Sequence, residues 1–221
     1  MGEAVGLPGG PTAWRAAPTD ARRGGLVICH AIWGVTPHLR DLAVTYAEVG
    51  YETLVPNLFE RFGQDFAETD TEPALMGRQT AYAEAADWGA ATMPAIQSAV
   101  DALQPPVFLM GFCFGGTAAW LAAARCRGLS AVAAYYGGGI PSHLDEAPQV
   151  PTILHLGKHD ELILPPQVDA ITGAYPDLPV YLYDAGHAFV APSGHHADSA
   201  RLSTLRTLQH FARHGGGRGE A

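Results

Sequence analysis

The feature of this chain that most constrains its fold is the glycine-rich segment 111–116, whose sequence is GFCFGG. The apolar run 107–110 precedes it and an alanine-rich run of helical character follows it, so the sequence predicts a strand, a sharp turn and a helix. Glycines around one reactive residue are typical of a nucleophile elbow, in which the turn presents that residue beside a helix N-terminus. The reactive residue here is Cys113, and a helix dipole favours the thiolate, which is the attacking form of cysteine. By itself, the pattern fits a buried cysteine in a glycine-rich turn equally well.

The remaining hydrophobic pattern predicts an α/β fold, with a mostly parallel sheet flanked by helices. Strands are expected at residues 26–30, 51–56, 107–110, 131–136, 152–156 and 180–183. Helices are expected at residues 36–49, 74–103, 117–126, 168–174 and 199–214, and Pro94 should kink or interrupt the second of them.

The length of 221 residues suits one domain, which we expect to span residues 1–221. Residues 1–25 are rich in glycine and proline, and only 12–16 have the pattern of a strand, so this end is expected to be an irregular edge of the sheet. Residues 215–221 begin with three glycines and are expected to form a flexible tail.

Composition excludes several classes of function. The net charge is −9 and no cluster of lysine and arginine stands out, which argues against a nucleic-acid partner. No apolar run is long enough to span a membrane, and no secretory signal is visible. The three cysteines lack paired spacing, which disfavours disulfides and zinc and indicates a reducing, cytoplasmic setting. We expect no metal and no cofactor, because His195 and His196 lie in a polar loop without the spacing of metal ligands.

Cys113, Asp160 and His187 each follow the carboxyl end of a predicted strand. In open parallel sheets these ends share one edge, where catalytic groups gather. The order nucleophile, acid, histidine is that of the α/β-hydrolases. Taken together, the three placements favour a catalytic triad over a buried cysteine, a turn aspartate and a loop histidine.

With these residues in place, the chain resembles the dienelactone hydrolase family, or carboxymethylenebutenolidases, which are small α/β-hydrolases with a cysteine nucleophile and no lid domain. The motifs that carry the resemblance are IWGV at 32–35, GFCFGG at 111–116, YYG at 135–137 and AGHAF at 185–189, with Asp160 following Gly157. The resemblance implies hydrolysis of small esters or lactones.

The resemblance also assigns roles. Cys113 would be the nucleophile, His187 the base and later the acid, and Asp160 the group that orients His187. The oxyanion hole would consist of the backbone N–H groups of Ile32 and Phe114.

Further residues would contact substrate. Arg78 matches one of two arginines that hold the substrate carboxylate in the family. Trp33, Phe112 and Phe189 flank the predicted site and are candidates for an apolar pocket, although core packing would explain each of them as well.

The chain departs from the family pattern at two positions. Ala31 stands where the lactonases have a glutamate that takes part in activating the thiol, and Ala191 stands where they have the second arginine. His30 is no automatic substitute for the glutamate, because neighbouring residues of a strand point to opposite faces. We therefore expect a pocket less suited to anions than that of a dedicated dienelactone hydrolase.

Three readings stay open from the sequence. The first is an esterase or lactonase that forms an acyl-enzyme and acts on a small-molecule ester or lactone. The second is a thioesterase or a biosynthetic acyl-transfer or cyclising enzyme on the same triad. The third is a non-hydrolytic relative that binds a ligand or senses oxidants through Cys113. A monomer or a weak homodimer is expected.

Overall fold

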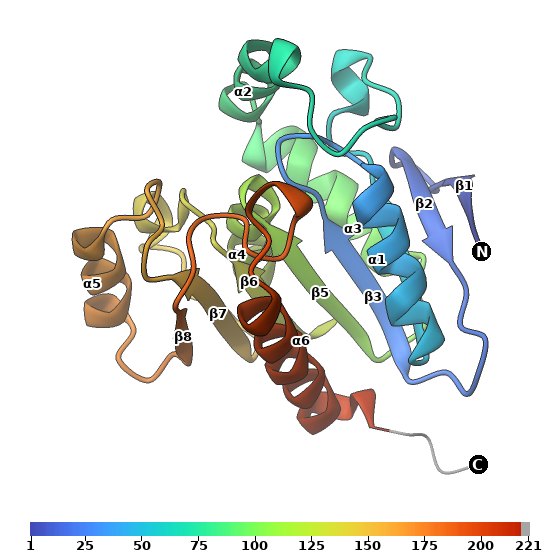
Figure 1. Cartoon of the computed structure of the whole chain (residues 1–221). Coiled ribbons are helices and arrows are strands. Elements are labelled where there is room, and N and C mark those ends of the chain that lie inside the picture. The colour runs from blue at the N-terminus through green and yellow to red at the C-terminus, as the bar shows by residue number, and fades with distance from the viewer. Residues whose placement is uncertain (218–221) are drawn as a thin grey trace.

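The framework of the protein is one eight-stranded sheet with helices on both faces (Figure 1), seen in a computed structural model that describes residues 1–217. The strands are β1 (Gly2–Gly6), β2 (Thr12–Ala16), β3 (Gly24–Cys29), β4 (Tyr51–Pro56), β5 (Val107–Phe112), β6 (Leu129–Tyr135), β7 (Thr152–Gly157) and β8 (Val180–Tyr183). The helices are α1 (Pro37–Glu48), α2 (Met76–Glu84), α3 (Met93–Asp101), α4 (Phe114–Arg125), α5 (Pro165–Ala174) and α6 (Ala197–Phe211). Short helical turns are η1 (Glu60–Phe62), η2 (Pro73–Leu75), η3 (Trp88–Thr92), η4 (Ile140–His143), η5 (Pro192–Gly194) and η6 (Ala212–Gly216).

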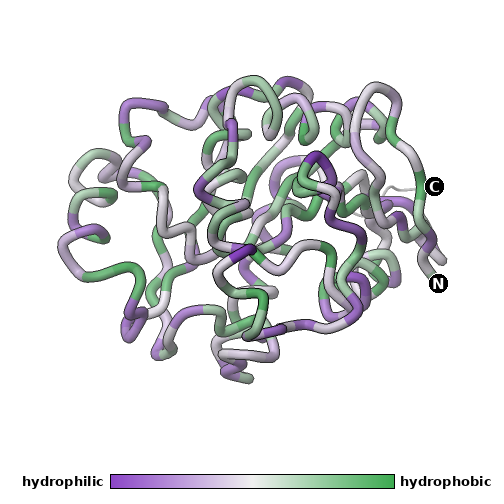
Figure 2. The backbone as a smooth tube through the Cα atoms, turned by 90° about the horizontal axis from the view of Figure 1, so that it is seen from above, coloured by the Kyte–Doolittle hydropathy of each residue, from purple (hydrophilic) through white to green (hydrophobic). Residues whose placement is uncertain are grey.

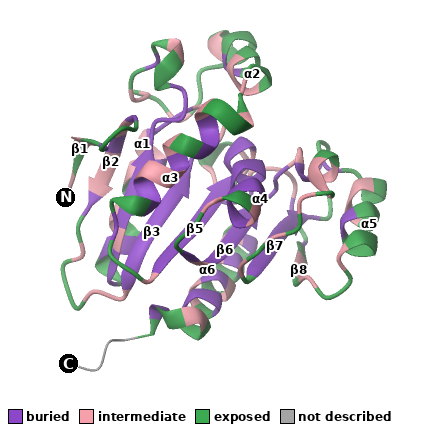
Figure 3. Ribbon diagram, turned by 180° about the vertical axis from the view of Figure 1, so that it is seen from behind, coloured by how far each residue is buried: buried purple, intermediate pink, exposed green. Residues whose placement is uncertain are grey.

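The strand order is β1-β2-β4-β3-β5-β6-β7-β8, and every pair from β4 to β8 is parallel. Only β1 and β2 run antiparallel to their neighbours. The prediction of a mostly parallel sheet is therefore confirmed. Its physical basis is that β3, β5 and β7 are buried along their whole length, which requires continuous apolar runs (Figure 3).

Each face of the sheet has its own hydrophobic core. On one face, alternate residues such as Val27 and Leu109 pack with α3 and α4. On the other face, Ile28 and Met110 pack with α1 and with Phe211 of α6. Figure 1 shows α1 and α6 in front of the sheet, with α3 and α4 behind it. The α1 and α4 helices therefore sandwich the central strands that carry the predicted elbow.

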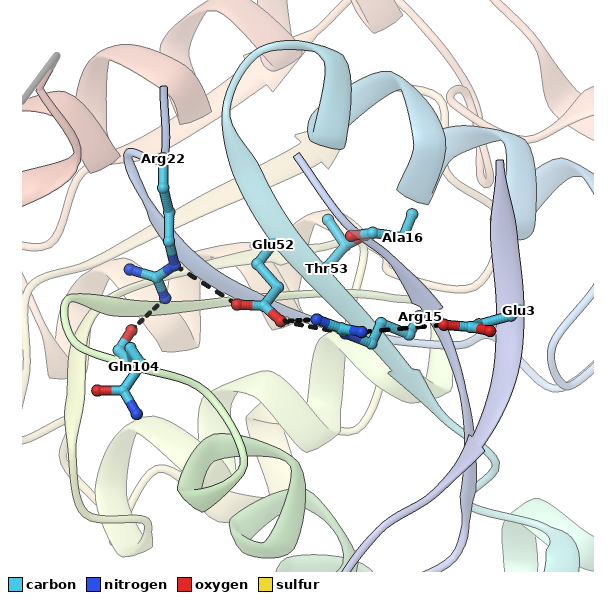
Figure 4. A network of polar contacts seen from close by, with 7 residues as sticks. All are labelled: Glu3, Arg15, Ala16, Arg22, Glu52, Thr53 and Gln104. Atoms are coloured by element: carbon cyan, nitrogen blue, oxygen red, sulfur yellow. Dashed lines mark hydrogen bonds and ion pairs between the residues drawn. The ribbon is translucent and has the colours of Figure 1, made fainter. Parts of the chain in front are cut away.

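The N-terminal edge is more regular than the sequence predicts, since residues 2–6 and 12–16 form β1 and β2. An ion-pair network ties these edge strands to β4 (Figure 4). Glu52 accepts a 2.7 Å bond from Arg15, pairs with Arg22 at 3.5 Å, and is partly buried, while Glu3 lies 3.9 Å from Arg15. Thr53 adds a 3.2 Å hydrogen bond to the carbonyl of Ala16.

The long helix expected over 74–103 is instead three segments, α2, η3 and α3. The break lies at 85–87, before the proline that was expected to cause it. Asp87 is the N-cap of η3, because its side chain accepts hydrogen bonds from the amides of Gly89 and Ala90. This cap starts a new helical segment instead of continuing α2. Pro94 lies in the first turn of α3, directly after η3, so it does not coincide with the break.

At the other end of the chain, residues 212–216 form η6. A flexible tail was predicted at 215–221, and residues 218–221 of it lie outside the described part of the chain. Along the chain, hydrophobic segments alternate with hydrophilic turns (Figure 2). Within residues 1–217, none of the helices combines the length and the apolar character needed to cross a bilayer.

Candidate active site

Cys113 occupies the sharp turn between β5 and α4, with the left-handed backbone angle φ 55°. Its N–H donates to the carbonyl of Tyr135 on the neighbouring strand, at 3.0 Å. The glycines make this turn possible, because a Cβ on Gly115 would lie 2.2 Å from the carbonyl oxygen of Cys29, and one on Gly111 would lie 2.0 Å from that of Gly115. Strand, turn and helix therefore pack backbone against backbone, and the half-buried thiol is held at the tip.

Asp160 lies in the turn after β7, with its side chain fully buried. Its Oδ1 accepts hydrogen bonds from the amides of Leu162 and Ile163, at 2.8 Å and 3.1 Å. Its Oδ2 is left for the histidine. A carboxylate held by two backbone donors has one fixed orientation, which suits a group that must orient another.

His187 follows β8, and the turn after β7 contacts the turn after β8 through their backbones. The amide of His159 donates to the carbonyl of Ala185 at 3.0 Å, and a Cβ on Gly157 would lie 2.4 Å from that same oxygen. This close approach brings the His187 Nδ1 to 2.8 Å from Asp160 Oδ2. Since an ionised carboxylate only accepts, Nδ1 is the protonated nitrogen.

The other ring nitrogen of His187, Nε2, is buried and interacts with the Cys113 thiol, although without the geometry of a well-formed hydrogen bond. Burial by itself lowers the pKa of His187. The hydrogen bond to Asp160 and the interaction with Cys113 outweigh burial and raise the pKa to about 9. The arrangement therefore stabilises an imidazolium beside the sulfur.

The backbone N–H groups of Ile32 and Phe114 were the predicted oxyanion hole. Neither of them donates a hydrogen bond within the part of the chain that the structure describes. Phe114 is the first residue of α4, so its amide has no partner within the helix. Ile32 lies in the loop after β3 and lines the same cavity as Cys113. Both donors are thus free to bind a ligand oxygen.

A cavity of about 530 Å³ opens in front of Cys113 and His187, and its surface is mostly apolar. The predicted site residues that line it are Ile32, Trp33, Phe112, Cys113 and His187. Its volume is within the range of pockets that bind small molecules. Two exposed apolar side chains, Met76 and Leu162, are 45% and 61% accessible and stand at its rim.

Two predicted substrate contacts lie elsewhere. Arg78 is exposed on α2, where its guanidinium lies over the Tyr82 ring, and it lines a separate cavity of about 320 Å³. Phe189 is fully buried in the core, with its ring 5.2 Å from that of Tyr136. Core packing therefore accounts for Phe189, and among the described residues no arginine or lysine lines the cavity at Cys113.

The two positions that depart from the family pattern, Ala31 and Ala191, both line the cavity. His30 faces away, as expected for the neighbour of Ala31. Its Nδ1 bonds the Ala31 carbonyl at 2.7 Å and its Nε2 accepts from the amide of Leu58, while burial lowers its pKa to about 4. His30 is therefore a neutral structural histidine, and the methyl group of Ala31 stands on the cavity wall where the lactonases have the glutamate.

Several residues of the cavity could not be recognised from the sequence. Tyr136 follows β6 with φ 37°, and its ring lies 5.0 Å from that of His187. His38 and Asp70 meet at the first turn of α1, where the His38 amide donates to Asp70 Oδ1 at 2.7 Å. The only sequence signal for any of them is the Tyr-Tyr-Gly stretch at the end of a predicted strand.

A larger cavity, of about 720 Å³, lies at the start of β7 and β8 beside α6. It is lined by residues such as Thr152, Tyr181 and Arg206, and it contains no cysteine. Over residues 1–217, no group of three or more His, Cys, Asp or Glu side chains is arranged to hold a metal ion. His196 instead caps α6, with Nδ1 2.7 Å from the Ser199 hydroxyl. The chemistry is therefore concentrated at the smaller cavity.

Comparison with known proteins agrees with this geometry. A model of the dienelactone hydrolase family matches residues 12–215. The carboxymethylenebutenolidase of Pseudomonas putida is 32% identical over 214 residues, which cover 89% of this chain and 88% of the relative. A putative carboxymethylenebutenolidase of Escherichia coli K12 is 31% identical over 227 residues, covering 92% and 83%. The crystal structure of a putative dienelactone hydrolase from Klebsiella pneumoniae matches with a TM-score of 0.77 at 24% identity, over 96% of this chain and 98% of that one. The resemblance read from the motifs is thus confirmed: the chain has the α/β-hydrolase fold and belongs to the dienelactone hydrolase family.

Proposed function

We propose that this protein hydrolyses small esters or lactones through a covalent acyl-enzyme on Cys113, with His187 and Asp160 completing a triad. The observation that carries the proposal is the 2.8 Å bond from His187 Nδ1 to the buried Asp160, with Nε2 turned to the thiol at the elbow. The relatives named carboxymethylenebutenolidase support a reaction on a lactone or ester.

In the first half of the proposed reaction, Nε2 of His187 already holds the proton of the Cys113 thiol, and the thiolate sulfur attacks the carbonyl carbon. Negative charge moves to the carbonyl oxygen, which would accept hydrogen bonds from the unpaired amides of Ile32 and Phe114. Asp160 stabilises the imidazolium of His187 throughout this step.

In the second half, the C–O bond breaks as His187 returns the proton to the leaving alkoxide, which leaves a thioester on Cys113. Water then attacks that thioester with His187 as base, releasing the acid and regenerating the thiol. A thioester substrate would enter by the same first step, and an acyl-transfer reaction would replace the water with another nucleophile. The mostly apolar cavity favours none of the three reactions, ester hydrolysis, thioester hydrolysis or acyl transfer, over the others.

Rapid mixing with an excess of an aryl ester tests the proposal. We expect a burst of aryl alcohol equal to about one per active site before the steady state, because the thioester forms faster than it is hydrolysed. A matched mixing experiment with Cys113→Ser, which replaces the thiol by a hydroxyl and nearly preserves the shape of the side chain, controls for loss of shape. Binding of the ester without release of any alcohol would contradict the proposal and favour a ligand-binding relative.

The raised pKa of His187 has a consequence for the thiol. A pKa of about 9 keeps the imidazole protonated at neutral pH, and its positive charge stabilises a thiolate beside it until the pH rises through that value. We expect iodoacetamide to inactivate the enzyme rapidly near neutrality, with the midpoint of the pH profile below about 8.5, the value of a free thiol. In His187→Gln the midpoint should rise to the free-thiol value or above. A wild-type midpoint at or above that value would contradict the ion pair.

A further inference from the structure

The charges around the cavity are unbalanced. Among the described residues 1–217 that line it, Asp70 is the only carboxylate, and no lysine or arginine accompanies it. Arg78, on α2, lies over Tyr82 and lines the neighbouring cavity instead. The thiolate–imidazolium pair of Cys113 and His187 is neutral as a pair, so it supplies no cation to a distant part of the substrate.

Asp70 is half-buried at the first turn of α1, where His38, Thr36 and Leu39 also line the cavity. One oxygen, Oδ1, accepts from the His38 amide at 2.7 Å. The other oxygen, Oδ2, has no hydrogen bond or ion pair within residues 1–217. Burial lowers the pKa of His38, so its imidazole is neutral at pH 7 and does not compensate the carboxylate. Asp70 thus offers one free, negatively charged acceptor to the cavity.

The rest of the cavity wall suits an organic cation. Trp33, Phe112 and Tyr136 line it, and aromatic faces attract ammonium groups that have lost water. A carboxylated substrate would meet Asp70 with no cation to offset the repulsion, whereas a neutral substrate would gain nothing from it.

We propose that the cavity selects esters or lactones bearing an ammonium group, which Asp70 binds through its free oxygen, over neutral or carboxylated ones of the same shape. This selection rests on the proposed hydrolysis at Cys113. It assigns Asp70 a role in specificity, in addition to its bond to the first turn of α1.

Three para-nitrophenyl esters test the proposal. The ammonium ester is made from γ-trimethylammonio-butyric acid, the neutral ester from the isosteric acid with a tert-butyl group in place of trimethylammonium, and the carboxylated ester is the monoester of glutaric acid. Each kcat/KM is divided by the rate of the same ester with hydroxide, which removes differences in intrinsic reactivity. We expect the ammonium ester to exceed the neutral isostere by about tenfold, which is the rate equivalent of about 1.4 kcal/mol. The carboxylated ester should be the poorest of the three.

The decisive variant is Asp70→Asn, because an asparagine Oδ1 still accepts from the His38 amide while the charge is removed. The ratio of ammonium to neutral ester should fall to about one in this variant. Asp65→Asn is the matched control, because it removes the same charge from an exposed residue that lines the neighbouring cavity. The control should keep the wild-type ratio.

A wild-type ratio of one or less, or a ratio unchanged in Asp70→Asn, would overturn the selection by Asp70. An equal loss in Asp65→Asn would mean that the net charge of the protein, and not Asp70, sets the preference. Hydrolysis of the neutral isostere tests the proposed hydrolysis independently of the role of Asp70. If none of the three esters is turned over, the proposed hydrolysis itself fails.

Discussion

Cys113→Ala is expected to lower kcat for an aryl ester by roughly 10⁴- to 10⁶-fold, the range seen when a nucleophile is removed from a triad. The reason is that Cys113 is the only cysteine among the described residues that line the cavity, and its thiol lies beside His187. Cys113 alone occupies the strained turn beside His187. The measurement is steady-state release of the aryl alcohol, with the melting temperature recorded to establish that the variant is folded.

Cys126→Ala is the matched control. Cys126 ends α4, away from the cavity, and burial raises the pKa of its thiol to about 11, so that it is a poor nucleophile at neutral pH. We expect its replacement to leave kcat close to that of the wild type, because Cys126 does not line the cavity. Full activity in Cys113→Ala, or a large loss in Cys126→Ala, would mean that the nucleophile has been assigned to the wrong residue.

Asp160→Asn should lower kcat by about 10² to 10⁴, because it reverses the tautomer of the histidine. The amides of Leu162 and Ile163 hold an acceptor at the Oδ1 position, so the amide nitrogen of asparagine would take the place of Oδ2 and donate to His187 Nδ1. The ring proton would then lie on Nε2, which could no longer accept the thiol proton.

The same substitution removes a carboxylate that raises the pKa of His187, so this pKa should fall below its present value of about 9. We expect the loss of activity to be accompanied by a shift of the iodoacetamide profile to higher pH. Asp184→Asn serves as the control, since Asp184 is an exposed carboxylate paired with His159 at 2.7 Å, three residues before His187. A purely structural role for Asp160 would lower activity and stability together and leave the alkylation profile unchanged.

The central strands and the elbow were predictable because burial on both faces of a sheet demands long apolar runs. Strands β4 and β8 begin and end where the hydrophobic pattern places them. The strand β1 was missed, since Gly2–Gly6 contains two glycines and pairs with β2 through its backbone, which leaves little trace in the side chains. The break at 85–87 depends on the cap made by Asp87, a local polar contact that competes with helical spacing.

The meeting of Cys113, His187 and Asp160 followed from the sequence, because the carboxyl ends of parallel strands must share an edge. The position of Arg78 did not follow, since α2 comes after a long irregular segment whose path no periodicity describes. Asp70 belongs to that segment, and its contact with α1 is tertiary. The wall of the cavity was therefore much less predictable than its reactive centre.

The most direct test of the account is to quench the reaction with an aryl butyrate in acid during the burst and to locate the butyryl group by mass spectrometry of peptides. We expect about one butyryl group per chain, as a thioester on Cys113 that hydroxylamine removes. The group should be absent from Cys113→Ala under the same conditions. A butyryl group on any other residue would contradict the central claim that Cys113 carries the acyl group. Release of aryl alcohol during the burst with no acylated peptide would contradict it as well.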